Sequence, residues 1–252
     1  MDLVNGNGDH QINHPLLKEK DDQEINRDLW IESKKLWQIA GPAIFSRVSA
    51  STMNIITQAY AGHLGEAELA AICIANNVIV GFNFGLLLGM ASALETLCGQ
   101  AFGAKRHHML GIYMQRSWII LFLFCFLLLP FVFATPILKW LGQPDDVAEL
   151  SGVVAVWMIP LHFSFEVQFS LQIFLQSQLK TRVIAWVSLV GLVVNASRSW
   201  LFVSVLDFGV IGAAVVLDIS WWVLVFGLYG YAAFGGCPLT WTGFSLQAFS
   251  GL

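Results

Sequence analysis

The sequence has few charged residues. Of its 252 residues only 12% are charged, whereas 56% are hydrophobic. A soluble domain carries about 25% charged residues, so this composition is typical of a membrane protein. The charges are also unevenly placed, because the first 35 residues hold eight acids and five bases. No basic surface remains that would indicate a nucleic-acid partner.

The sequence also lacks the residue patterns of enzymes and metal sites. No CxxC pair, no Cys/His spacing for a metal, no nucleophile–base pair and no phosphate-binding loop is present. We therefore predict that the protein is not an enzyme and holds no metal or organic cofactor. The polar, acidic N-terminal stretch has no apolar region that would act as a secretory signal.

Six apolar segments follow this stretch, each near the ~20 residues that cross a bilayer as a helix. They span residues 36–61, 69–94, 111–135, 151–176, 183–206 and 210–233. The short links between them make successive helices antiparallel neighbours. We predict an all-α polytopic membrane protein built as a six-helix bundle. Residues 1–35 would be a disordered cytoplasmic tail, 36–233 the transmembrane lobe and 234–252 a cytoplasmic linker.

Lysine and arginine residues indicate the orientation of these helices. The tail, the second loop and the fourth loop carry ten Lys and Arg residues, whereas the opposite side carries only Lys139. Because short cytoplasmic loops are enriched in Lys and Arg, we predict a cytoplasmic N-terminus.

Polar residues inside the membrane are candidates for function, because they are costly there. Arg47, Ser51, Asn54 and Gln58 share one face of the first helix through spacings of four, three and four. This stripe predicts the lining of a substrate cavity, to which Asn77 of the second helix would contribute. Hydrogen bonding between helices is the alternative interpretation.

Three ionisable residues lie deep in the later helices. Glu166 belongs to the fourth, Arg198 to the fifth and Asp218 to the sixth. Arg198 and Asp218 are each eight residues from the short turn that joins their helices, so we predict that they pair across this hairpin. The pair would be either structural or part of transport. Pro130 and Pro160 are expected to kink the third and fourth helices.

The stretch from Ala93 to His108 ends the second helix and begins the following loop. Glu95 lies at the edge of the apolar segment, and Lys105 and Arg106 follow in the loop. We predict that Glu95 meets one of these bases and helps to lock an inner gate. On the same helix, Gly81, Gly85, Gly89 and Ala93 form a face of small residues, which lets another helix approach closely.

Seven motifs recur in order along the chain after the tail. They are GPAIFSRVS (41–49), AGHLGEAELAA (61–71), ALETLCGQAFGA (93–104), YMQRSW (113–118), LGQ (141–143), FLQSQ (174–178) and CPLTWTGFS (237–245). On these motifs the chain resembles plant-type multidrug and toxic compound extrusion (MATE) transporters of the Detoxification group. The resemblance implies the N-terminal lobe of a transporter whose twelve helices form two lobes, with 234–252 leading toward the second lobe.

The resemblance also implies a function. Members move small organic solutes or xenobiotics out of the cytoplasm, across the vacuolar or plasma membrane. They work by alternating access and are driven by a proton gradient. The acidic cation site of plant members lies in the second lobe, and the first helix here has no Asp or Glu. The alternative is a truncated or splice-derived fragment without transport activity, acting through association with a full-length partner or a second lobe.

Overall fold

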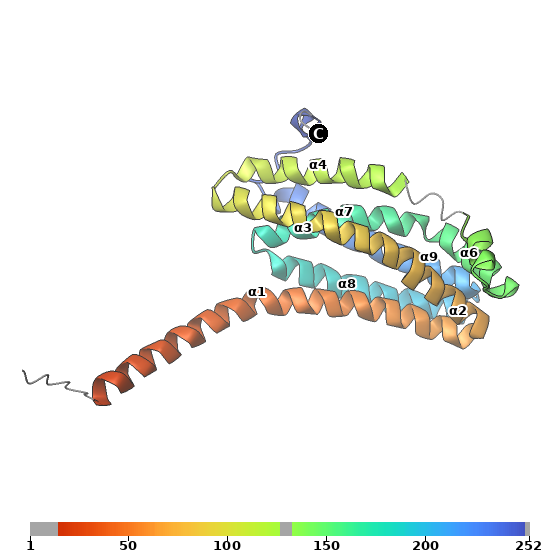
Figure 1. Cartoon of the computed structure of the whole chain (residues 1–252), viewed down its shortest axis with the longest axis horizontal. Coiled ribbons are helices and arrows are strands. Elements are labelled where there is room, and N and C mark those ends of the chain that lie inside the picture. The colour runs from red at the N-terminus through yellow and green to blue at the C-terminus, as the bar shows by residue number, and fades with distance from the viewer. Residues whose placement is uncertain (1–14, 127–132, 250–252) are drawn as a thin grey trace, which may run out of the picture. The chain divides into compact units, whose positions relative to one another are not determined.

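The computed structural model describes residues 15–126 and 133–249, whose regular structure is entirely helical. The all-α prediction is therefore confirmed. In chain order (Figure 1) the helices are α1 (Pro15–Leu64), α2 (Glu66–Ile74), η1 (Ala75–Val80), α3 (Gly81–Gly103), α4 (His107–Phe126), α5 (Ala134–Trp140), α6 (Asp145–Trp157), α7 (Ile159–Ser177), α8 (Thr181–Ser199), η3 (Trp200–Val205), α9 (Gly209–Tyr231), η4 (Ala232–Gly236) and η5 (Leu246–Ala248). The chain divides into two units, Met1–Gly41 and Pro42–Leu252, which are described separately.

The first unit contains the N-terminal part of α1. The structure is helical from Pro15, within the region predicted to be a disordered tail. The residues from Asn26 to Gln38 are all exposed. A helix without a buried face gains no stabilisation from tertiary packing. The predicted tail, with its boundary at residue 35, stays a prediction.

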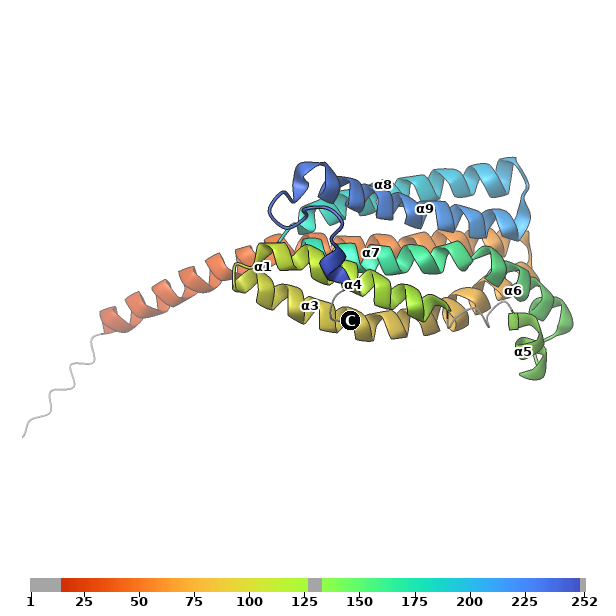
Figure 2. The same cartoon turned by 90° about the horizontal axis from the view of Figure 1, so that it is seen from above.

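The second unit is a bundle with α7 as its central helix (Figures 1 and 2). This helix packs against α3, α4 and α9, while α8 packs against α9 and α2 against α6. Two glycines let α8 and α9 approach closely. A Cβ at Gly191 would lie 2.8 Å from Leu224 Cδ2, and one at Gly227 would lie 2.7 Å from Val187 Cγ1.

Five of the six predicted segments fall on helices of the described residues: 36–61 on α1, 69–94 on α2 to α3, 151–176 on α6 and α7, 183–206 on α8 and η3, and 210–233 on α9 and η4. The segment 111–135 begins on α4 and continues beyond the described residues. By length and composition, three helical stretches of the described residues can cross a membrane: 66–103, 181–205 and 209–236. The pair α6 and α7, which is bent by 47°, makes a fourth if the two helices count as one broken span. Pro160 stands at the start of α7, and its missing N–H explains this break, so the predicted kink is confirmed. Pro130 lies outside the described residues.

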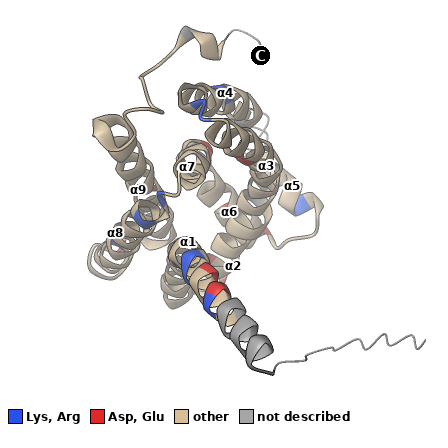
Figure 3. Ribbon diagram, turned by 90° about the vertical axis from the view of Figure 1, so that its left-hand side faces the viewer, with Lys and Arg blue, Asp and Glu red and all other residues tan. Residues whose placement is uncertain are grey.

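Figure 3 shows that Lys, Arg, Asp and Glu are sparse along the helices of the bundle. In the second unit, the turn between α3 and α4 lies at the same end as the turn between α7 and α8 (Figure 2). At the other end, Lys139 of α5 binds Asp145 and Glu149 of α6 at 3.1 and 2.8 Å. Its hydrogen bonds to Glu149 and Asp145 raise the pKa of Lys139 above its ordinary value.

The segment after η4 is bound to the bundle rather than hanging from it. We call Cys237–Ala248 the strap. Both polar atoms of the Gln115 amide on α4 bind the strap backbone. Nε2 donates to Gly243 O at 3.0 Å, and Oε1 accepts from Ser245 N at 2.8 Å. Residues 237–248 of the predicted linker therefore follow a defined path across the first half of α4.

Two further contacts fix the strap. Thr240 donates to Gln178 at the end of α7 at 2.9 Å, and Lys180 donates to the Gly236 carbonyl just before the strap. The ring of Trp241 packs 6.1 Å from that of Trp118 on α4 and 6.0 Å from that of Tyr229 on α9. The strap thus joins the middle of α4 to the ends of α7 and α9.

Candidate functional site

The buried face of α1 is not the predicted polar stripe but the face beside it. The buried residues share spacings of three and four; they are Ser46, Ser49, Met53, Thr57 and Ala61. The stripe lies about 100° around the helix from this face. Ser51 is exposed, and Asn54 and Gln58 are half-buried.

Arg47 is the member of the stripe that lines a described cavity. This cavity, of about 150 Å³, lies between α1, α3 and α7. Its polar wall residues are Arg47 from α1, Ser92 and Glu95 from α3, and Gln172 and Gln176 from α7. Arg47, predicted to line a substrate cavity, and Glu95, predicted to belong to an inner gate, thus line the same cavity. Asn77 is exposed and stands away from this wall, so its role, like those of Ser51, Asn54 and Gln58, stays a prediction.

The geometry of Arg47 is set by an aromatic ring. Its guanidinium carbon lies 5.6 Å from the ring centre of Phe169 on α7, a cation–π contact. Gln172, one turn further along α7, is 7% exposed, and its Oε1 accepts from Gln168 Nε2 at 3.0 Å. These glutamines were not singled out in the sequence, although their spacing of four placed them on one face.

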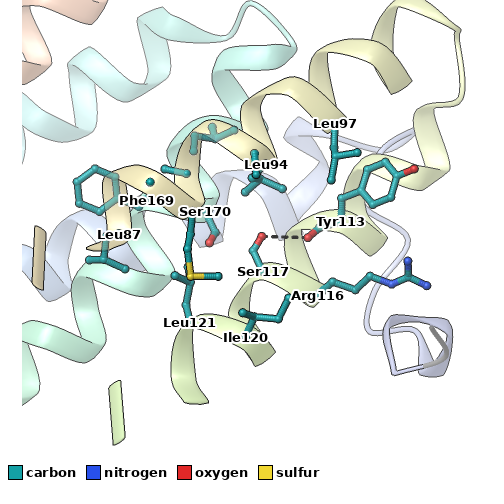
Figure 4. A pocket seen from close by; sticks show the side chains of 15 residues that line it. Leu87, Leu94, Leu97, Tyr113, Arg116, Ser117, Ile120, Leu121, Phe169 and Ser170 are labelled. Carbon is teal, nitrogen blue, oxygen red and sulfur yellow. Dashed lines mark hydrogen bonds between the residues drawn. The ribbon is translucent and has the colours of Figure 1, made fainter. Parts of the chain in front are cut away.

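A second, larger cavity is apolar. It encloses about 500 Å³ between α3, α4 and α7. Figure 4 shows Leu94, Leu121 and Phe169 around it, whereas the side chain of Arg116 points away. Ser117 donates to the Tyr113 carbonyl at 3.0 Å, so this hydroxyl is satisfied within α4. The cavity can therefore take an apolar group but offers few polar contacts.

The predicted partners of Glu95 are not in contact with it. Among residues 15–126 and 133–249, Glu95 forms no ion pair with Lys105 or Arg106, which are both exposed. Glu95 instead shares the cavity wall with Arg47. Its part in an inner gate stays a prediction.

The predicted ion pair between Arg198 and Asp218 does not form. Arg198 is exposed, whereas Asp218 is buried, and within the described part of the chain no ion pair joins them. The buried residues of α8 include Asn195 and Ser199, and a helix turns by about 100° per residue. Arg198 therefore lies outside the face that meets α9. Glu166 is buried in α7.

A polar pair joins α3 to α7. Asn83 Nδ2 and His162 Nδ1 lie 2.9 Å apart, and both residues are buried. His162 was missed in the sequence, because a single histidine in an apolar segment resembles a core residue. The pair fixes α3 at the depth where α7 begins.

The sequence of this all-helical lobe matches a known family. The MatE family profile matches residues 42–201, which is more than half of the chain. The chain belongs to the MatE family. This is a family of transporters and not of enzymes, so the prediction that the chain is not an enzyme is confirmed.

Relatives in this family are close in sequence. Protein DETOXIFICATION 27 of Arabidopsis thaliana is 63% identical over 96% of this chain, which covers 50% of that protein. DETOXIFICATION 28 of the same plant is 60% identical over 94% of the chain. The chain thus spans about half the length of these relatives and corresponds to their N-terminal half.

Solved structures show the same fold. The eukaryotic MATE transporter AtDTX14 is 34% identical and superposes with a TM-score of 0.82 over 88% of this chain and 50% of its own. The Vibrio cholerae MATE transporter VcmN, at 20% identity and a TM-score of 0.72, has the same fold. The chain is therefore an integral multi-pass membrane protein of the MatE family.

Proposed function

We propose that this chain is the solute-binding half of a proton-coupled antiporter, which exports small organic solutes or xenobiotics by alternating access. The cavity between α1, α3 and α7 carries this proposal. Its walls hold a cation, Arg47, and an anion, Glu95, in a chain whose family transports solutes. A proton gradient is the proposed driving force.

Two buried acids are the proposed proton-linked groups in this half. Glu166 on α7 and Asp218 on α9 are both buried, and residues 42–64 of α1 contain no Asp or Glu. Buried acids within a membrane bundle are candidates for proton transfer. The resemblance drawn from the sequence also implies a coupling site in the second half of the family's transporters.

The second candidate function is a chain without transport activity of its own that acts through a partner, and an exposed helix face favours it. The chain covers half of its relatives. The small-residue face of α3 is exposed, and a Cβ at Gly85 or Gly89 would meet nothing within 4 Å. Such a face suits contact with another helix. We propose a second lobe or a full-length partner as the source of that helix.

The proposed location is the vacuolar or the plasma membrane, with a cytoplasmic N-terminus. The ten Lys and Arg residues of the tail and the even loops support this orientation. The turn between α3 and α4 and the turn between α7 and α8 belong to one end of the bundle (Figure 2), which agrees with a single basic side.

Flux measurements in liposomes test these proposals. The 252-residue chain is compared with a chimera that continues into the second half of DETOXIFICATION 27. A pH gradient is imposed, and uptake of labelled organic cations, anions and zwitterions is followed. Flux from both proteins supports an active half, and flux from the chimera alone supports the second candidate function. Absence of gradient-driven flux from both would overturn the antiport proposal.

A further inference from the structure

The cavity between α1, α3 and α7 is lined by two opposite charges, both on exposed residues, that do not pair with each other. Arg47 and Glu95 both line it. Neither forms an ion pair with any residue of the described ranges, 15–126 and 133–249. Opposite charges within one small cavity attract ligands that carry the complementary charges. The spatial order of these two charges therefore indicates which solutes fit.

The wall near α1 offers hydrogen-bond donors. The Arg47 guanidinium lies over the Phe169 ring, and its N–H groups have no acceptor among the described residues. Gln172 uses its Oε1 to accept from Gln168, which leaves its amide NH₂ for the cavity. An arginine fork beside an amide donor is the usual environment of a bound carboxylate.

The wall near α3 offers acceptors. Glu95 and Ser92 stand one turn apart on α3, and Gln176 completes this side from α7. The Ser92 hydroxyl donates to the Gly89 carbonyl at 2.7 Å, so the lone pairs of its oxygen face other partners. A carboxylate, a hydroxyl oxygen and an amide oxygen together suit an ammonium group, which has three donors and no acceptor.

We propose that this cavity binds a small zwitterionic solute, with its carboxylate at Arg47 and Gln172 and its ammonium at Glu95. A solute with one charge is attracted by one wall and repelled by the other, whereas a zwitterion is attracted by both. The cavity, at about 150 Å³, is smaller than the about 300–1,000 Å³ of sites for drug-sized ligands. Apolar residues lie between the walls; they are Leu88, Ala91 and Ile173.

This inference rests on the proposed function only in treating the solute as cargo, because binding can be measured without transport. The 252-residue chain in lipid nanodiscs is titrated with phenylalanine, 3-phenylpropanoate and 2-phenylethylamine. These probes share the ring and carry both charges, the acid alone or the amine alone. We expect phenylalanine to bind at least about tenfold more tightly than either relative. Equal affinity for a singly charged probe, or no binding of any probe, would overturn the inference.

Substitutions test which wall holds which charge. Arg47→Gln should weaken phenylalanine binding at least about tenfold while sparing 2-phenylethylamine. Glu95→Gln should weaken phenylalanine equally while sparing 3-phenylpropanoate. Arg182→Gln is the matched control, because Arg182 is exposed on α8 and away from this cavity. The double variant Arg47→Glu with Glu95→Arg should regain most of the affinity for phenylalanine, because a zwitterion can bind in the reverse direction.

The two proposals can fail separately. If phenylalanine binds as expected but no gradient-driven flux is seen, the antiport proposal fails and the site remains. If flux of other solutes is seen but the substitutions change no binding, the zwitterion site is refuted and the antiport proposal remains. If Arg47→Gln lost binding of all three probes, a melting curve of that variant would show whether it is misfolded. Loss of all three with a normal melting curve would refute the assigned orientation of the solute.

Discussion

Releasing the strap by the substitution Gln115→Ala gives a direct test of its docking. The Gln115 side chain is 6% exposed and makes two hydrogen bonds to the strap backbone, to Gly243 and from Ser245. Each such bond contributes about 1 kcal/mol net, so their loss costs about 2 kcal/mol. Because 1.4 kcal/mol corresponds to about a tenfold change, the strap should open about 30-fold more often.

Hydrogen exchange measured by mass spectrometry on peptides covering residues 237–248 reads this opening. The exchange rate of the strap amides should rise about 30-fold, while peptides of α7 stay unchanged. The aromatic contacts of Trp241 remain, so the strap should open more often without detaching. Gln100→Ala is the control, since Gln100 is exposed on α3 and its side chain makes no described hydrogen bond.

A second variant reaches the same contact by steric means. A Cβ at Gly111 would lie 2.6 Å from the Thr240 carbonyl oxygen, a backbone atom that can move only with the strap. Gly111→Ala should therefore also speed exchange across residues 237–248, with every hydrogen-bonding side chain still present. If both variants left exchange within about threefold of the parent, the strap would not be held by these contacts.

Three further predictions concern the contacts between helices. Asn83→Leu should destabilise the protein by about 1–3 kcal/mol in thermal unfolding, because it leaves the buried His162 without its partner. Adding His162→Leu should recover part of this stability, and a further loss of stability would contradict the pairing. Gly191→Ala should lower stability by about 1–3 kcal/mol through its clash with α9, whereas Gly85→Ala, which meets nothing, should not; equal effects would contradict the close approach. Lys139→Ala should leave the melting temperature unchanged, because its ion pairs are solvent-exposed, and a clear drop would show that they stabilise α5.

The helical segments could be predicted because the signals for them are local. Length and hydropathy determine whether a segment can cross a bilayer, and the ring of Pro160 determines where the fourth segment breaks. The π-helical turns at η1 and η3 left no such signal, because a slip in the hydrogen-bond ladder depends on what packs against the helix. Local sequence thus predicts helices better than their irregularities.

Which side of a helix becomes buried was harder to predict. The stripe on α1 was chosen for its polarity, but the bundle buries the neighbouring face, where Ser46, Ser49 and Ala50 are small enough for close packing. The predicted ion pair of Arg198 with Asp218 was wrong for the same reason. Its depth followed from the length of the turn, but its direction around α8 is set by Gly191, Asn195 and Ser199 on the buried face.

The ring contacts of α7 link the cavity to the rest of the bundle. Phe169, whose ring lies beneath Arg47, is 5.1 Å from the ring of Phe84 on α3 and 6.3 Å from that of Phe165. Phe165 in turn lies 4.4 Å from the ring of Trp221 on α9. Rings packed at these distances leave little room for a single one to turn, because protein interiors are close-packed. The ring beneath Arg47 is therefore held from α3 by Phe84 and, through Phe165, from α9 by Trp221, so the face of α7 that would meet a bound solute is fixed by the packing of the bundle.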